Sequence, residues 1–195
     1  MPYHIYHTEA LILGGLQRGE GDRLLFCYTK ELGLVLAHAK SIREGRSKLR
    51  YALQTFAHTY IDLVSGKSGW RLISARPVSS FRESWSDGEK RRILARQAQL
   101  LRRLIQGEER NEKLFDDVLS GVHFLHTRTQ DNDLPEVELL MVVRLLHELG
   151  YWGNKEKFAP LFEAGAWHAD SLEYIRGIRG ELLAEVNDSL QSSQL

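Results

Sequence analysis

The sequence predicts an α+β chain in which a small five-stranded β-barrel precedes an all-helical domain. Up to about residue 80, short segments rich in aromatic and β-branched residues alternate in polarity, as half-buried strands do. After Pro77 the apolar residues recur at helical spacing instead. We therefore divide the chain into a barrel domain, residues 1–80, and a helical domain, residues 81–195.

Glycine-containing turns separate the expected strands, and one long connection, residues 41–53, joins the third to the fourth. Five short strands within about 75 residues are typical of a closed or nearly closed barrel. The expected strands are 8–16, 23–29, 34–40, 56–64 and 70–78.

The first helix is expected at about 86–106, with Ser86 as N-cap, Glu89 completing a capping box, and Gly107 ending the helix. Its arginines face away from its apolar side. Three further helices are expected: one from Asn111, one from about 133 to Gly150, and one at about 170–190. Residues 139–143 are apolar nearly all round, which places the third helix in the middle of the bundle.

The charge of the chain is divided between its two halves. The 26 basic and 26 acidic side chains cancel, but residues 1–106 hold 18 Lys/Arg and 9 Asp/Glu, whereas residues 107–195 hold 8 and 17. The first half can meet a polyanion and the second is better suited to proteins. The alternative is that both halves simply carry solvated charges.

Composition narrows the class of protein. A hydrophobic content of 43% indicates a globular chain rather than a disordered one. We expect no membrane partner, because no apolar run reaches the ~18 residues of a span, and no secretory signal. The single cysteine, Cys27, lies in an apolar strand and is expected to be inert packing in a reduced, cytoplasmic protein.

Motifs for catalysis are incomplete. Gly14 and Gly19 have the spacing of a phosphate-binding loop, but Glu20 stands where that loop needs lysine. A zinc-protease helix would need a second histidine four residues after His147, at the position of Tyr151. We therefore expect no enzyme, no cofactor and no metal.

The connection between the third and fourth strands is strongly basic. Flexible cations beside a barrel suit a phosphate backbone, because each neutralised phosphate releases counterions. Aromatic residues nearby could stack bases or belong to the core. The core reading is favoured for Phe26, Phe56 and Trp70, whereas Tyr28 and Tyr51 stay open.

Several motifs occur together in the order found in one protein family. They are the turn formed by Gly19, Glu20 and Asp22, the basic loop 39–50, the Leu-Gln-x-Phe segment at 53–56, and the Leu-Leu-x-x-Leu-Gly-Tyr helix end at 145–151. In this order they resemble RecO, the bacterial DNA repair and recombination mediator family.

The resemblance implies an OB-fold followed by a helical domain, single- and double-stranded DNA binding, and annealing of complementary strands without nucleotide hydrolysis. It implies work with RecR in loading RecA onto DNA coated by single-stranded-DNA-binding protein, contact with that protein's C-terminal tail, and a cytoplasmic, nucleoid-associated location. Many RecO proteins carry a four-cysteine zinc module after this helix end, whereas residues 152–169 contain no cysteine. The chain is also shorter than usual, which puts its C-terminal partner contacts in doubt.

The resulting hypothesis assigns phosphate contacts along one basic track. Its residues are Lys40, Arg43, Arg46, Lys48, Arg50 and Tyr51 in the loop, Arg18 and Arg23 at the first turn, Lys67 in the last turn, and Arg92, Arg96 and Arg103 on the first helix. Two other functions stay open: a general single-stranded RNA- or DNA-binding module, and a protein adaptor with incidental DNA affinity.

Overall fold

A computed structural model describes residues 4–40, 42, 52–79, 81, 86–105, 107–127, 130–153, 156–163 and 165–192. The chain forms two compact units. The barrel unit comprises Met1–Phe81 together with Ile105–Phe115, and the helical unit comprises Arg82–Leu104 and Asp116–Leu195. A short segment between two helices therefore belongs with the barrel.

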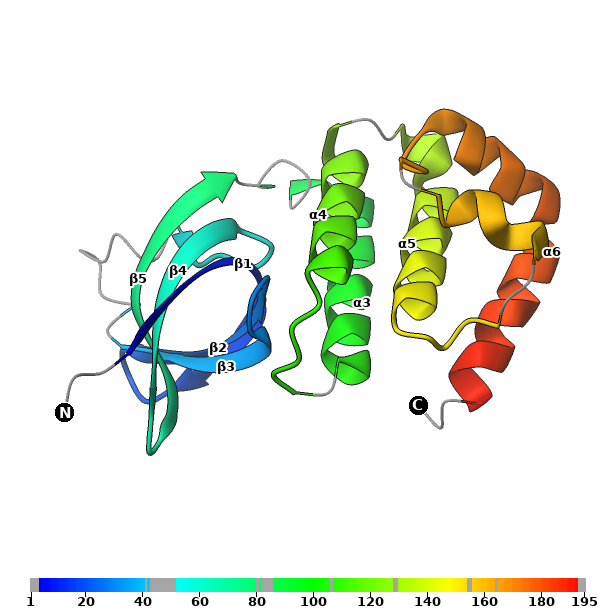
Figure 1. The fold of residues 1–195 in the computed structure, drawn as a ribbon. Helices are drawn as coiled ribbons and strands as arrows, with labels where there is room; N and C mark the ends of the chain where they lie inside the picture. The colour runs from blue at the N-terminus through cyan, green and yellow to red at the C-terminus, as the bar shows by residue number, and fades with distance from the viewer. Residues whose placement is uncertain are drawn as a thin grey trace. The chain divides into compact units, whose positions relative to one another are not determined.

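The five expected strands are confirmed. They are β1 (Ile5–Arg18), β2 (Asp22–Thr29), β3 (Gly33–Ala39), β4 (His58–Gly66) and β5 (Gly69–Ser79). They close a barrel in the order β1-β2-β3-β5-β4 (Figure 1). All neighbours are antiparallel except β3 and β5, which are parallel. This five-stranded closed barrel followed by helices is the expected OB-type architecture.

The fourth strand begins two residues later than expected because of Phe56. Its backbone has φ 61, a left-handed conformation that a strand does not accommodate. Its N–H donates to the carbonyl of Ile12 at 2.6 Å, which holds the turn against β1. The strand proper starts at His58.

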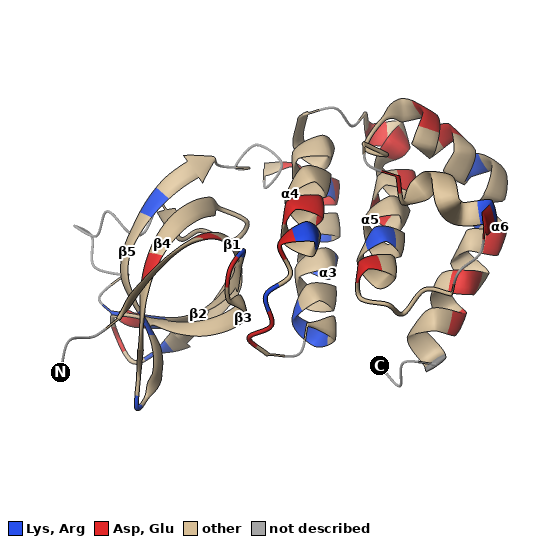
Figure 2. Ribbon diagram, viewed as in Figure 1, with Lys and Arg blue, Asp and Glu red and all other residues tan. Residues whose placement is uncertain are grey.

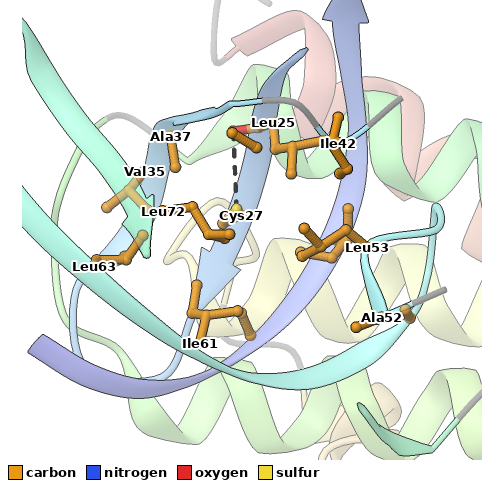
Figure 3. Close-up of a cluster of buried hydrophobic side chains, with 14 residues drawn as sticks. Leu25, Cys27, Val35, Ala37, Ile42, Ala52, Leu53, Ile61, Leu63 and Leu72 are labelled. Atoms are coloured by element: carbon orange, nitrogen blue, oxygen red, sulfur yellow. Dashed lines mark hydrogen bonds between the residues drawn. The ribbon is translucent and has the colours of Figure 1, made fainter. Parts of the chain in front are cut away.

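Alternate residues of each strand fill the barrel (Figure 3). On β2 the inward side chains are Leu25 and Cys27, both fully buried, whereas Leu24 and Phe26 are half-buried on the other face. The connection after β3 contributes Ile42 and Leu53 to the same cluster. The barrel is therefore closed by side chains from the long connection as well as from its strands.

The helices lie close to the expected positions. They are α3 (Gly88–Leu104), α4 (Glu112–Thr127), α5 (Leu134–Glu148) and α6 (Ala169–Ser192), with short 3₁₀ turns at Asp131–Asp133 and Glu156–Leu161. The second of these turns was not expected, because six residues are too few to establish a period. Among the described residues, no helix combines the length and apolarity that crossing a membrane requires.

The predicted N-cap of α3 is wrong by one residue. Asp87, not Ser86, caps the helix, since its Oδ1 accepts the N–H groups of Glu89 at 2.9 Å and Lys90 at 3.1 Å. A carboxylate at this position also stabilises the positive end of the helix dipole. The predicted start of α4 at Asn111 is confirmed, and this residue caps the helix: Asn111 Oδ1 accepts the N–H of Leu114 at 3.0 Å.

The central position of α5 is confirmed. It packs against both α3 and α6. Val137, Leu140 and Val143 are completely buried, and two charged residues of the same helix, Glu136 and Arg144, are 5% and 7% exposed. Each of these charges has an ionic partner on a neighbouring helix, as burial of a charge requires.

Candidate nucleic-acid interface

Strand pairing brings three of the expected cations to one end of the barrel. Arg18 ends β1 opposite Asp22, and Arg23 lies opposite Ala39, the residue before Lys40. Arg18 and Lys40 are exposed, and Arg23 is half-buried. In the part of the chain that is described, these three cations have no ionic partner within the protein.

The long basic connection leaves the barrel from this end. Its five remaining candidates, Arg43, Arg46, Lys48, Arg50 and Tyr51, lie outside the described residues. The residues that flank them are described, and Ile42 and Ala52 are both buried in the barrel core. The connection is thus anchored in the barrel core on both sides.

Lys67 lies elsewhere on the barrel, exposed in the turn between β4 and β5. Three residues later Trp70 begins the pairing with β3, opposite Ala37. Trp70 is half-buried, with its ring edge-on to Tyr6 at 5.1 Å between centroids. Its indole N–H donates to Glu108 Oε1 at 2.6 Å.

Two aromatic candidates belong to the interior. Phe56 and Tyr28 are each 1% exposed, so neither ring offers a face on which a base could stack. Tyr28 was an open case, and Phe115 at 5.5 Å between ring centroids explains its burial. Phe26 is half-buried.

An exposed apolar face on β1, β2 and β3 was not identified from the sequence. Leu16 is 55% exposed and pairs across the sheet with Leu24, and Leu36 is 41% exposed and pairs with Phe26. In OB barrels the face around the second and third strands carries the ligand. The sequence of β2 contained a signal for this face, because the strand carries apolar residues on both of its faces.

The arginines of α3 are exposed, as expected, but differ in their surroundings. Blue segments on α3 in Figure 2 mark lysine and arginine residues. Arg92 lies 2.9 Å from Glu89 on the same helix. Arg96 donates to both carboxylate oxygens of Glu138 on α5, at 2.5 and 2.7 Å, and this hydrogen bonding raises the pKa of Arg96. Arg103 has no such ion pair among the described residues.

The described residues contain no group of three or more His, Cys, Asp or Glu side chains placed to hold a metal ion. The thiol of Cys27 is fully buried, and burial raises its pKa to about 12. A thiol in this state is not a nucleophile at neutral pH. Its role is packing, as its place in an apolar strand indicated.

The strand order and the helices that follow define an OB-fold barrel protein with an appended helical unit. Residues 1–81 match the family described as "Recombination protein O N terminal". The barrel, residues 1–81, is therefore a RecO N-terminal domain.

Similarity to individual relatives extends into the helical unit. The chain is 34% identical over 147 residues to the DNA repair protein RecO of Heliobacterium modesticaldum, covering 75% of this chain and 52% of that protein. It is 29% identical over 153 residues to the RecO protein of Clostridium novyi, covering 78% and 59%, and 28% identical over 147 residues to that of Desulfitobacterium hafniense, covering 75% and 52%. The chain spans about half the length of the curated relatives it matches.

Proposed function

We propose that this chain is a DNA-binding recombination mediator in DNA repair, which binds single- and double-stranded DNA through the basic end of its barrel. The observation that carries the proposal is the strand register that gathers Arg18, Arg23 and Lys40 where the basic connection leaves the barrel. The match of residues 1–81 to the RecO family and the similarity to DNA repair proteins named RecO support the same function.

Annealing follows from charge neutralisation. Cations that hold the phosphates of two complementary strands lower the repulsion between them, so the strands pair without sequence preference and without nucleotide hydrolysis. The loop cations Arg43, Arg46 and Lys48 extend the set provided by Arg18 and Lys40. Bulk affinity in this scheme comes from phosphates, not from base edges.

The acidic second half of the chain has a different role in this proposal. Residues 107–195 carry 17 acidic and 8 basic side chains, so this half repels DNA and is assigned to protein partners. By analogy with the family, these partners are RecR and the C-terminal tail of single-stranded-DNA-binding protein, with RecA loading as the outcome. A pull-down with the tail peptide tests this assignment.

Salt titration tests the electrostatic claim directly. Affinity for an oligonucleotide of mixed sequence should fall steeply between about 50 and 200 mM salt. Changing Arg43, Arg46 and Lys48 together to Ala should reduce the slope of log affinity against log salt by about 2 for single strands, and equally for all sequences. A flat salt response in the unmodified protein contradicts the proposal.

A matched pair of double variants identifies which surface is used. Arg18→Ala with Lys40→Ala removes two exposed charges from the basic barrel end, and Lys155→Ala with Lys157→Ala removes two charges from the acidic half, outside the barrel unit. Only the first pair should weaken DNA binding and slow annealing of complementary strands. Equal losses in both pairs would mean that overall charge, not the barrel end, determines affinity.

A protein adaptor with incidental DNA affinity is the second candidate. The apolar face formed by Leu16, Leu24, Phe26 and Leu36 favours it, because aliphatic side chains suit a protein surface better than a base. This function predicts partner binding that survives neutralisation of the basic connection. Loss of partner binding in Leu16→Ser with Leu36→Ser, at unchanged DNA affinity, would favour the adaptor.

A further inference from the structure

The barrel is least closed between β3 and β5. Their parallel pairing comprises two positions among the described strands, Ala37 with Trp70 and His38 with Arg71. The first half of β3, from Gly33 to Leu36, therefore has no register partner on β5. A barrel with a short seam of this kind needs other groups to cover the edge of the strand.

Residues 107–109, the segment that we call the clasp, contact both sides of this seam. On the β3 side, the N–H of Leu34 donates to the carbonyl of Gly107 at 3.3 Å. On the β5 side, Glu108 Oε1 accepts the indole N–H of Trp70 at 2.6 Å. The clasp therefore connects the two strands where their own pairing ends.

The contact between the clasp and β3 requires glycine at position 33. Its φ of 67 is a conformation that L side chains rarely adopt. A Cβ at this position would lie 2.4 Å from the carbonyl oxygen of Glu109 and 2.7 Å from its backbone nitrogen. Only glycine lets the backbone of the clasp approach β3 this closely.

The clasp brings negative charge to a nucleic-acid-binding barrel. Glu108 and Glu109 are exposed, and Glu108 bonds the one polar atom of an aromatic ring that follows the basic turn at Lys67. A half-buried indole three residues after an exposed lysine can offer a nucleic-acid strand both a ring for stacking and a positive charge. The carboxylates of the clasp oppose that contact by repelling phosphates.

We propose that the clasp is an autoinhibitory contact that competes with single-stranded nucleic acid for Trp70 and the β3–β5 seam. This inference rests on the proposed DNA-binding function. The Trp70–Glu108 hydrogen bond that joins the clasp to β5 is exposed, so the clasp can open without unfolding the barrel. The chain enters the clasp from α3 and leaves it into α4.

Two substitutions that each remove one negative charge distinguish the effect of the Trp70–Glu108 hydrogen bond from the effect of charge alone. Glu108→Gln weakens the ionic hydrogen bond to Trp70, whereas Glu109→Gln removes a neighbouring charge and leaves that bond in place. We expect single-strand affinity to rise about 3- to 10-fold in Glu108→Gln, and clearly less in Glu109→Gln. Equal changes in the two variants would overturn the proposal.

A double-mutant cycle tests the pair itself. Trp70→Phe keeps an aromatic ring but removes the N–H donor, so it should raise affinity as Glu108→Gln does. Adding Glu108→Gln in the Trp70→Phe background should then leave only the charge effect seen in Glu109→Gln. Fully additive effects would show that Glu108 does not act through Trp70, and would overturn the proposal.

Hydrogen exchange shows whether a negative result contradicts the clasp proposal or the proposed DNA-binding function. The amide of Leu34 should exchange faster in Glu108→Gln, and in Gly33→Ala, which displaces the clasp without changing charge. If Gly33→Ala fails to fold, Glu108→Gln still decides the result. If the Leu34 amide exchanges at the same rate in these variants as in the unmodified protein, the proposal that the clasp opens is overturned. If the Leu34 amide exchanges faster but neither the unmodified protein nor any variant binds DNA, the proposed DNA-binding function is wrong. Competition between the clasp and DNA is then also excluded.

Discussion

The guanidinium of Arg144 on α5 donates from Nε to both carboxylate oxygens of Asp117 on α4, at 2.8 and 2.9 Å. The same guanidinium donates from Nη1 to the carbonyls of Leu161 at 2.6 Å and Glu163 at 3.2 Å. The indole N–H of Trp167 donates to Asp117 at 3.2 Å. A single buried ion pair thus joins two helices to the irregular segment that precedes α6.

Replacing Arg144 by Met should lower the free energy of unfolding by about 3–5 kcal/mol, because it leaves Asp117 as an uncompensated buried charge. Replacing both residues, Arg144→Met with Asp117→Leu, should recover much of the loss. Urea unfolding followed by circular dichroism measures both. If the double variant is less stable than either single variant, the ion pair is not the source of the effect.

Gly121 on α4 should not tolerate a larger side chain. A Cβ there would lie 2.7 Å from the six-membered ring of Trp167, whose indole is held by Asp117. Gly121→Ala should therefore cost about 1–3 kcal/mol despite the better helix propensity of alanine. Thermal unfolding measures this loss, with Gly177→Ala on α6 as the control, because nothing lies within 4 Å of a Cβ there. Gly177→Ala should be neutral or stabilising.

The thiol of Cys27 should react only when the barrel unfolds. It is fully buried, and burial raises its pKa to about 12. At pH 8 a thiol reagent should label the native protein orders of magnitude more slowly than a peptide thiol. Labelling should accelerate in urea in parallel with unfolding. Rapid labelling of the native protein would contradict the packing of the barrel core.

Asp62 on β4 should make the barrel sensitive to acid. A hydrogen bond from Ser74, then the hydrogen bond and charge of His7, hold the pKa of Asp62 below its ordinary value of 3.8. Because the folded pKa is lowered, the stabilisation is present above about pH 4 and is lost as the pH falls through the folded value.

Asp62→Asn should remove this part of the acid sensitivity. The free energy of unfolding of the variant should fall less between pH 5 and pH 3, measured by urea titration at each pH. Asp188→Asn, at an exposed position on α6, serves as the comparison. An identical pH profile for the unmodified protein and Asp62→Asn would show that the carboxylate is not stabilised in the fold.

Arg103 and Arg96 on α3 should differ in their effect on DNA. Arg96 is held by Glu138, whereas Arg103 is exposed without an ion pair among the described side chains. Arg103→Ala should therefore weaken DNA binding about threefold at low salt, and Arg96→Ala should change it less. Arg96→Ala should instead lower stability by less than about 1 kcal/mol, because the pair is exposed. Unchanged DNA binding in both variants would exclude α3 from the basic track.

The strands could be predicted because each reports its own environment. On β2, the alternation of Leu25 and Cys27 with Leu24 and Phe26 sets the faces of the strand without knowledge of the rest of the chain. The start of α4 at Asn111 is equally local, since the capping side chain bonds an N–H three residues away. For α3 the local signal was ambiguous, because Ser86 and Asp87 are both good caps.

Long-range partners could not be predicted. Tyr28 lies on the same strand face as Leu24, but Phe115 covers it, and nothing near Tyr28 in the sequence announces that contact. In the same way, Arg96 resembles Arg103 in its local sequence, and only the packing of α5 against α3 gives it Glu138 as a partner.

By itself, the sequence determined the five strands, the four long helices and the uneven charge, because spacing, capping and composition are local properties. Only the tertiary structure decided that Arg18, Arg23 and Lys40 meet at one barrel end and that Glu108 reaches Trp70. These relationships depend on strand register and on the connection between α3 and α4, which contains Glu108. Strand register is determined by the free energy of the whole closed barrel, so the sequence of a single segment does not determine which distant residues meet.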